Sequence, residues 1–251
     1  MSNQSARGEL RIGCAGWTLQ RDAQSLFGEG ESHLTRYGTR LNAVEINSSF
    51  YRPHSHATYA KWAASAPRDF HFSVKLPKAI THELRLQQCA TLLDSFFNDV
   101  GGLGTKLGCV LVQLPPSFTF DSRLTRDFLS ELAARWAGDI SIEPRHASWF
   151  EDEAHGLLQE FRIARVLADP VRHAAGAMPG GASHLVYLRL HGSPRMYYSS
   201  YEDRVIETLA ARIEMALTGG VNIWCIFDNT ASGAATHNAL ALQARFTKEP
   251  A

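Results

Sequence analysis

Carboxylate and histidine side chains recur at the ends of short apolar runs in this sequence, where their types suit acid–base chemistry. We place Glu143 and His191 at the centre of this chemistry, as the base and the acid. A carboxylate acts as an acid or a base where burial or a neighbouring charge shifts its pKa, whereas imidazole titrates near neutral pH without help. Two further carboxylates end similar runs and complete the catalytic candidates, Glu45 and Asp169.

Cationic side chains end the same kind of run and predict a site for a small anion, formed by Lys75, Arg145 and Arg189. A lysine supplies a point charge, and an arginine supplies forked donors that match phosphate or carboxylate. The alternative is a structural network in which Glu143 and Arg189, or Asp169 and Arg145, only neutralise one another. Other polar side chains near the run ends complete the predicted substrate-binding set: Asn47, His82, Gln113, Tyr201, Asp228 and Asn229.

The spacing within these runs predicts that the candidate residues share one face of a sheet. A strand sends successive side chains to opposite faces, so in the run 187–191 Tyr187, Arg189 and His191 lie together. The same alternation in the second to seventh runs places their odd-numbered residues on that face. We therefore expect one continuous polar surface from Glu45 to His191.

Eight short apolar runs and the helical patterns between them predict the elements that position these residues. The segments between the runs have apolar residues three and four positions apart, which is the helical pattern. Strands that alternate with helices indicate parallel βα units. Eight units in 251 residues predict an α/β protein with a closed (β/α)8 TIM barrel, whose active site lies at the carboxyl ends of the strands. The predicted strands are 10–13, 43–47, 71–75, 109–113, 141–145, 167–169, 187–191 and 224–228, and the predicted helices are 59–66, 89–100, 124–136, 154–161, 205–217 and 234–246.

The composition predicts one domain over residues 10–247, preceded by a flexible segment over 1–9. Two stretches depart from the regular pattern, 21–31 and the glycine-rich 170–183 after the sixth strand. The formal net charge is zero, so broad electrostatic binding of nucleic acid or of an anionic membrane is not indicated. The expected partner is a small anionic molecule that carries phosphate or carboxylate.

The termini and the cysteines predict a cytoplasmic protein. Residues 1–8 lack the apolar stretch of a signal peptide, and the longest apolar run, near 223–227, is too short to span a bilayer. The four cysteines lie far apart without paired spacing, so we expect them to be reduced and mostly buried: Cys14, Cys89, Cys109 and Cys225.

The glycine-rich segment 101–106 has the composition of a phosphate loop but not its context. A phosphate loop follows a strand and opens a helix, whereas this segment follows a predicted helix and precedes a strand. We interpret it as a helix stop with glycine in the left-handed conformation.

Specific motifs along nearly the whole chain, from Ile12 to Leu242, resemble the YecE-like barrels known as domain of unknown function 72. The resemblance implies a TIM-barrel fold with a polar mouth and carries no established reaction. This sequence has Asp228 where asparagine is frequent in the family, which adds a negative charge. The segment after His191 keeps the aromatic character of a lid, in which Tyr201 is expected to face the pocket. The motifs cover residues 13–17, 44–51, 74–75, 80–82, 112–118, 143–149, 168–169, 187–192, 227–230, 233–235 and 238–239.

Three functions remain open at this point. The first, which we favour, is an enzyme that acts on a small anionic or polyhydroxylated substrate by carboxylate and histidine proton transfer. The second is a metal-dependent hydrolase or isomerase, for instance of phosphoesters, in which a divalent metal binds the carboxylates and His191. The third is a barrel that binds a ligand without turnover. No cofactor is predicted for the favoured function.

Overall fold

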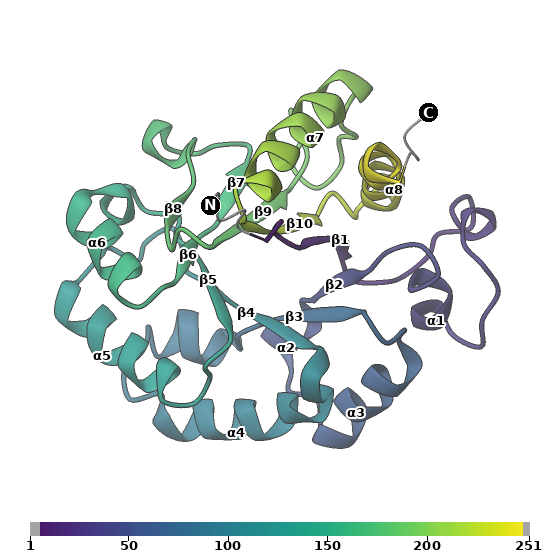
Figure 1. The fold of residues 1–251 in the computed structure, drawn as a ribbon. Coiled ribbons are helices and arrows are strands. Elements are labelled where there is room, and N and C mark those ends of the chain that lie inside the picture. The colour runs from purple at the N-terminus through teal and green to yellow at the C-terminus, as the bar shows by residue number, and fades with distance from the viewer. Residues whose placement is uncertain (1–5, 248–251) are drawn as a thin grey trace.

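A computed structural model describes residues 6–247 as a central sheet surrounded by helices (Figure 1). The strands are β1 (Leu10–Ala15), β2 (Ala43–Ile46), β3 (His71–Lys75), β4 (Leu107–Gln113), β5 (Asp139–Glu143), β6 (Ala164–Arg165), β7 (Leu167–Asp169), β8 (Gly180–Gly181), β9 (Leu185–Leu190) and β10 (Asn222–Phe227). The α-helices are α1 (His33–Tyr37), α2 (Ser48–Tyr51), α3 (His56–Ser65), α4 (Ala90–Val100), α5 (Ser122–Ala133), α6 (Asp152–Glu160), α7 (Asp203–Thr218) and α8 (Ala234–Phe246). Short 3-10 turns cover Gln24–Leu26, Gly101–Lys106, Ala147–Phe150 and Ala174–Gly176, and a π-helical turn covers Ala79–Glu83.

The sheet has ten strands in the order β7-β9-β10-β1-β2-β3-β4-β5-β6-β8 and is nearly closed. All pairs are parallel except β6 with β8. β6 pairs with β5 and β7 pairs with β9, and Val166 alone separates β6 from β7, so the two sides of the sheet meet there. The sequence predicts one sixth strand and eight strands in all. The structure instead has a mixed α/β domain with a mostly parallel sheet, a broken sixth strand and a short antiparallel strand.

Alternation along the strands separates two hydrophobic cores. Val44, Phe72 and Ile142 belong to the large core between sheet and helices. A second cluster fills the inside of the sheet, where the rings of Tyr187 and Trp224 stack with centroids 5.9 Å apart. The predicted polar residues of β2, β3, β5 and β9 lie on this inner side, above the apolar layer.

The sixth strand has the opposite parity from the predicted one. Ala164, Val166 and Ala168 line the inner cluster, so the side chains of Leu167 and Asp169 point to the outer face of the sheet. The prediction that Asp169 shares the inner surface was therefore wrong. A three-residue strand offers too little alternation to fix its own parity, and the break at Val166 removes the neighbouring strand residues as a guide.

The predicted irregular segment 170–183 is confirmed. Within the described residues no α-helix lies between β7 and β9, where the chain forms only the 3-10 turn at Ala174–Gly176 and the short β8. The segment 101–106 is a 3-10 turn after α4, in which Gly104 has a φ of 56°. The four cysteines are free and buried, as expected. No helix of residues 6–247 has the length and apolar character needed to cross a membrane.

The predicted flexible segment 1–9 lies partly outside the described residues, and its last residues are fixed. Arg7 forms an ion pair with Glu214 of α7. The backbone amide of Gly8 donates to the carbonyl of Leu217 at 2.8 Å, and the amide of Glu9 donates to the Asn222 side chain at 2.9 Å. This stretch therefore leads into β1 along the end of α7.

Candidate functional site

Arg189 of β9 is the centre of a buried charge cluster inside the sheet. Its guanidinium donates to both carboxylate oxygens of Glu45, at 3.0 and 2.6 Å. It also donates to Glu143 Oε2, and to Asp228 Oδ2 at 2.9 Å. Only 1% of Arg189 is exposed, and burial opposes its charge, but these carboxylates hold its pKa well above the ordinary value. Arg189 is therefore neutralised within the protein.

This pairing leaves the predicted anion site of Lys75, Arg145 and Arg189 without support from the structure. Hydrogen bonds to carboxylates use four of the five N–H groups of Arg189, and Arg145 directs Nη2 to Glu143 Oε1 at 3.2 Å. The structural network considered from the sequence holds for Glu143 and Arg189, whereas Asp169 lies on the other face and does not pair with Arg145. Spacing could not show this, because three carboxylates from three strands converge on one guanidinium.

Glu45 is a structural partner of this cluster. It is fully buried, and besides Arg189 it accepts a hydrogen bond from the Tyr187 hydroxyl at 2.8 Å. That hydroxyl also lies 2.8 Å from Ser73 Oγ. Burial, reinforced by the Glu45 charge, raises the pKa of Tyr187 well above its usual value. Both oxygens of Glu45 are thus occupied, and we assign it a positioning role rather than the predicted catalytic one.

His191 directly follows β9 and is held between two carboxylates of the cluster. Its Nδ1 lies 2.9 Å from Asp228 Oδ2, and its Nε2 lies 3.4 Å from Glu143 Oε1. Nε2 is buried and has no hydrogen-bond partner within residues 6–247. Burial lowers the pKa of His191, but the contacts of its two ring nitrogens with the Asp228 and Glu143 carboxylates outweigh it, so the net shift is upward. The imidazolium form is favoured more than in a free histidine, and its Nε2–H has only the long contact with Glu143.

Glu143 lies beside His191, as the sequence predicts, but its basicity is low. Burial alone would raise its pKa, yet the charge of Arg189 and the contacts with His191 and Arg145 hold that pKa well below the ordinary value. A carboxylate with so low a pKa keeps its negative charge and accepts a proton poorly. Glu143 therefore suits holding His191 charged better than abstracting a proton.

Lys75 lies at the end of β3 without a salt-bridge partner among the described residues. It is 7% exposed, and its Nζ lies 4.0 Å from the centroid of the Phe50 ring. Burial and the charge of Arg189 lower the pKa of Lys75 to about 8, although Glu45, Glu143 and Asp228 oppose this shift. A neutral amine is therefore accessible near neutral pH, which the sequence could not show.

Two amide side chains lie at the carboxyl ends of the strands beside Lys75. Asn47 directly follows β2, and its Oδ1 is buried without a hydrogen-bond partner in the described part of the chain. Gln113 ends β4, is 7% exposed and makes no side-chain hydrogen bond to residues 6–247. A buried polar atom without a partner normally finds one in water or a ligand. Asn47, Lys75 and Gln113 therefore carry polar groups without a hydrogen-bond or ion-pair partner in the described residues, at the carboxyl ends of three neighbouring strands.

The space above His191 is small. A cavity of about 20 Å³ is lined there by Glu143, Arg145 and His191 together with loop residues that include Phe150 and His173. A volume of this size corresponds to roughly one water molecule. His173 Nε2 lies 3.2 Å from the carbonyl of Arg145, so the segment after β7 packs directly over this side of the mouth.

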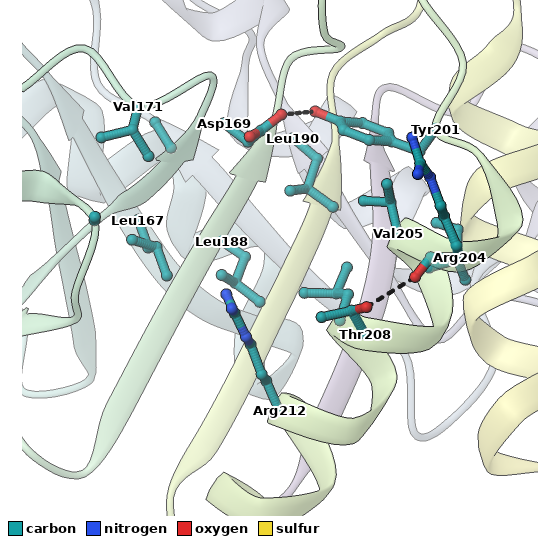
Figure 2. Close-up of a pocket in the computed structure, with 14 residues that line it drawn as sticks. Leu167, Asp169, Val171, Leu188, Leu190, Tyr201, Arg204, Val205, Thr208 and Arg212 are labelled. Atoms are coloured by element: carbon teal, nitrogen blue, oxygen red, sulfur yellow. Dashed lines mark hydrogen bonds between the residues drawn. The ribbon is translucent and has the colours of Figure 1, made fainter. Parts of the chain in front are cut away.

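Three of the predicted residues do not face the inner surface. The Asp169 carboxylate accepts a hydrogen bond from the Tyr201 hydroxyl at 2.6 Å, on the outer side of the sheet (Figure 2). The same hydroxyl accepts from the amide of Gly192 at 2.8 Å. Asn229 donates to the carbonyl of Ser199 at 2.9 Å and to Asn238 at 2.8 Å. These contacts fix the segment after β9 against α8, so Tyr201 and Asn229 are structural residues.

His82 and two aromatic residues complete the rim. His82, in the π-helical turn after β3, packs edge-on against Phe50 with ring centroids 5.0 Å apart. Burial and the nearby charges of Lys75 and Arg145 lower the pKa of His82. Tyr197, not the predicted Tyr201, contacts His191, with ring centroids 5.7 Å apart. The aromatic segment 197–201 pointed to the right loop but could not distinguish its tyrosines.

A divalent metal has no ready set of ligands in this arrangement. Within residues 6–247 no group of three or more His, Cys, Asp or Glu side chains is placed to hold a metal ion. Glu45, Glu143 and Asp228 direct their oxygens at Arg189, which a metal would have to displace. The geometry therefore gives no support to the metal-dependent alternative.

Comparisons with known proteins agree with the fold. The family model "Protein of unknown function DUF72" matches residues 11–251. The chain is 28% identical over 154 residues to the UPF0759 protein YecE of Escherichia coli K12, covering 58% of this chain and 56% of YecE. It is 26% identical over 149 residues to the UPF0759 protein YunF of Bacillus subtilis 168, covering 56% and 52%. These matches span about half the length of each relative.

Crystal structures of two DUF72 family proteins have the same fold as this chain. The protein from Enterococcus faecalis V583 gives a TM-score of 0.80 at 20% identity and covers 96% of this chain and 97% of its own. The protein from Thermotoga maritima MSB8 gives 0.77 at 22% identity, covering 96% and 100%. Because the family model matches nearly the whole chain, the chain belongs to the DUF72 family.

Proposed function

We propose that this protein is an enzyme that transfers protons on a small polar molecule at the carboxyl ends of the strands. One observation carries the proposal: His191 is held between Asp228 and Glu143 with a buried, unbonded Nε2. An imidazole that a carboxylate holds at Nδ1, and whose Nε2–H makes no hydrogen bond to the protein, can donate that proton in general acid catalysis.

His191 is the proton donor in this proposal, and Lys75 is the proton acceptor. Glu143 keeps His191 charged, because it remains ionised beside Arg189. Lys75 supplies the base, since its pKa of about 8 leaves part of its amine neutral near neutral pH. Lys75 thereby takes the role of base that the sequence predicts for Glu143.

The charge balance favours a polyhydroxylated substrate with no more than one negative charge. With His191 protonated and Lys75 neutral, as these roles require, the cations Arg145, Arg189 and His191 balance the carboxylates Glu45, Glu143 and Asp228. Protonation of Lys75 adds one net positive charge. The amides of Asn47 and Gln113 suit hydroxyl groups, which need both donors and acceptors.

We also infer that β6 and β7 act as one bent strand. Val166 alone interrupts them, and its amide donates to the carbonyl of Ile142 at 2.8 Å, which continues the pairing with β5. Counted in this way, the sheet would have eight parallel strands and the short antiparallel β8, and the parallel strands would form the (β/α)8 barrel that the sequence predicts. The site would then lie at the end of the barrel where active sites of this fold occur.

Solvent exchange tests the proposal without knowledge of the full reaction. The protein is incubated in D₂O with a panel of sugars, sugar acids and sugar monophosphates, and incorporation of deuterium at carbon is followed by NMR. We expect exchange with at least one compound, and His191→Asn should slow it by about 100-fold or more. His56→Asn, on an exposed position of α3, should leave the rate unchanged.

Two results would contradict the proposal. An exchange rate in His191→Asn equal to that of the wild type would show that His191 is structural. No exchange with any compound, combined with a rise in melting temperature on addition of one of them, would support the ligand-binding barrel without turnover.

A further inference from the structure

Within the described residues no α-helix lies between β7 and β9 in the chain, so α7 alone borders the outer face of these two strands. In most βα units of this chain a helix packs on the outer face of its strands, but β7 and β9 are joined by the irregular segment 170–184. Leu167, Leu188 and Leu190 therefore face a groove whose other wall is α7 (Figure 2).

This groove has the size and lining of a small-molecule site. Its volume is about 390 Å³, within the range of roughly 300–1,000 Å³ that is typical of ligand pockets. Besides the three leucines, Val171 of the irregular segment and Val205 and Leu209 of α7 line it. An apolar body of moderate size would cover this surface and remove it from water.

The charges at the groove are mainly positive. Arg212 of α7 lies at one end with its guanidinium near Leu188, and it has no ion-pair or hydrogen-bond partner among residues 6–247 (Figure 2). Arg204 lies at the other end and contacts the exposed Glu202 at 2.9 Å. The only carboxylate in the lining, Asp169, already accepts a hydrogen bond from Tyr201.

We infer that the groove binds a small amphipathic anion, with an alkyl chain on the leucines and a carboxylate at Arg212. The apolar leucine surface suits the alkyl chain of the ligand, and the cation at one end suits a single anionic group. The groove lies on the outside of the sheet, whereas His191 and Lys75 lie inside it. The inference is therefore independent of the proposed function and can be tested by binding alone.

Calorimetric titration with decanoate, below the concentration at which it forms micelles, tests the inference. We expect saturable binding of one decanoate per chain, and affinity that rises by about fourfold for each methylene from hexanoate to decanoate. Uncharged decanol should bind more weakly than decanoate. Arg212→Gln should weaken decanoate binding by about fivefold, the size expected for an exposed charge contact.

Matched variants separate the groove from general charge effects. Arg123→Gln removes an exposed arginine of α5 that has no ion-pair partner in the described residues, and it should bind decanoate like the wild type. Val205→Glu places a carboxylate in the groove at a position that is 41% exposed, and should abolish binding while circular dichroism shows a folded protein. Val205→Gln, of similar size without the charge, should keep most of the affinity.

Three results would overturn the inference. The first is no decanoate binding by the wild type, and the second is equal binding by Arg212→Gln and the wild type. The third is a dimer in sedimentation experiments that Val205→Glu dissociates, without decanoate binding, because the groove would then be an interface between two copies of the chain.

Discussion

Lys75 carries its charge at the expense of the stability of the folded state. The unfolded chain holds this amine with its ordinary pKa of 10.5, whereas burial lowers the pKa to about 8 in the folded protein. The unfolded state therefore binds the proton more tightly, and stability rises as the pH increases from about 8 to 10.5. Below pH 8 the full penalty applies, which for this shift is about 3 kcal/mol.

Lys75→Met should raise the free energy of unfolding by about 2–3 kcal/mol at pH 7, because it removes that penalty and keeps an apolar contact with Phe50. The gain should vanish above pH 10.5, where lysine is neutral in both states. Urea unfolding at pH 7 and pH 11 measures both values. A less stable variant at pH 7 would mean that Lys75 has an anionic partner in solution.

Glu143→Gln should lower the pKa of His191. Removal of the Glu143 charge leaves Asp228 as the remaining carboxylate on the imidazole, so the imidazolium form loses one of its two stabilising ion-pair contacts. NMR titration of the His191 ring protons should show a lower pKa than in the wild type, and the deuterium exchange rate should fall at pH 7. An unchanged pKa would show that Glu143 does not control the charge of His191.

The loss of a charged partner of Arg189 in the same variant should also reduce stability by roughly 3 kcal/mol or more. Glu151→Gln is the matched control, since this glutamate is exposed before α6 and should affect neither the pKa nor the stability.

Sequence patterns located most of these residues but not their partners. Tyr187, Arg189 and His191 were correctly placed on one face, because five consecutive residues of one strand fix their own alternation. Their contacts depend on how far the neighbouring strands are displaced along one another, which the sequence of a single strand does not contain. The low basicity of Glu143 and the shifted Lys75 follow from those contacts, so they could not be predicted.

Among the secondary-structure elements, the segment between β9 and α7 is held in place by Tyr201. Its hydroxyl joins Asp169 of β7 to the amide of Gly192, directly after His191. One side chain thus connects the outer face of the sheet to the loop that holds Tyr197 over the site.

Tyr201→Phe should reduce the free energy of unfolding by about 2 kcal/mol, because it removes a hydrogen bond to a carboxylate and leaves the Gly192 amide without its partner. Amide exchange in residues 192–200 should accelerate more than in α8. Urea unfolding and hydrogen–deuterium exchange provide the two measurements. Tyr198→Phe, on an exposed ring whose hydroxyl has no hydrogen bond within residues 6–247, is the control and should change neither.

The order of the elements was readable from the sequence because helical and strand periodicities alternate clearly along the chain. The sixth strand was the exception. With β6 and β7 only two and three residues long, neighbouring strands rather than their own sequence decide which side chains point inward. Ala168 faces inward although Asp169 is the polar residue, so polarity misled the prediction at that strand.

The charge cluster connects four strands, so the stability of the whole molecule depends on pH. Arg189 on β9 joins Glu45 at β2, Glu143 at β5 and Asp228 after β10. Since the pKa of Glu143 lies below its unfolded value of 4.5, its contribution to stability is fully present above pH 4.5 and is lost as the pH falls through the folded value. The raised pKa of His191 has the opposite effect, with stability fully present below pH 6.5 and lost as the pH rises through the folded value.

We therefore expect these two groups to contribute most between pH 4.5 and 6.5, and the sheet to unfold cooperatively in acid. Urea unfolding from pH 3 to pH 8 measures this. In Arg189→Met three carboxylates lose their cation, which should reduce the free energy of unfolding at pH 6 by about 3–5 kcal/mol or more. A sloping, multi-step acid transition in the wild type would show that the cluster does not hold the strands as one unit.

A guanidinium shared by three carboxylates also constrains how this protein can change. Any single replacement within the set leaves a buried charge without its counterpart, so intermediates along a mutational path are less stable than either end, and substitutions there are strongly epistatic. Asn47, Gln113 and Tyr197 lie outside the shared contacts and outside the proposed acid and base, so they can be exchanged one at a time. New substrate preferences, whether evolved or engineered, should therefore arise from these three positions while the charge cluster stays the same.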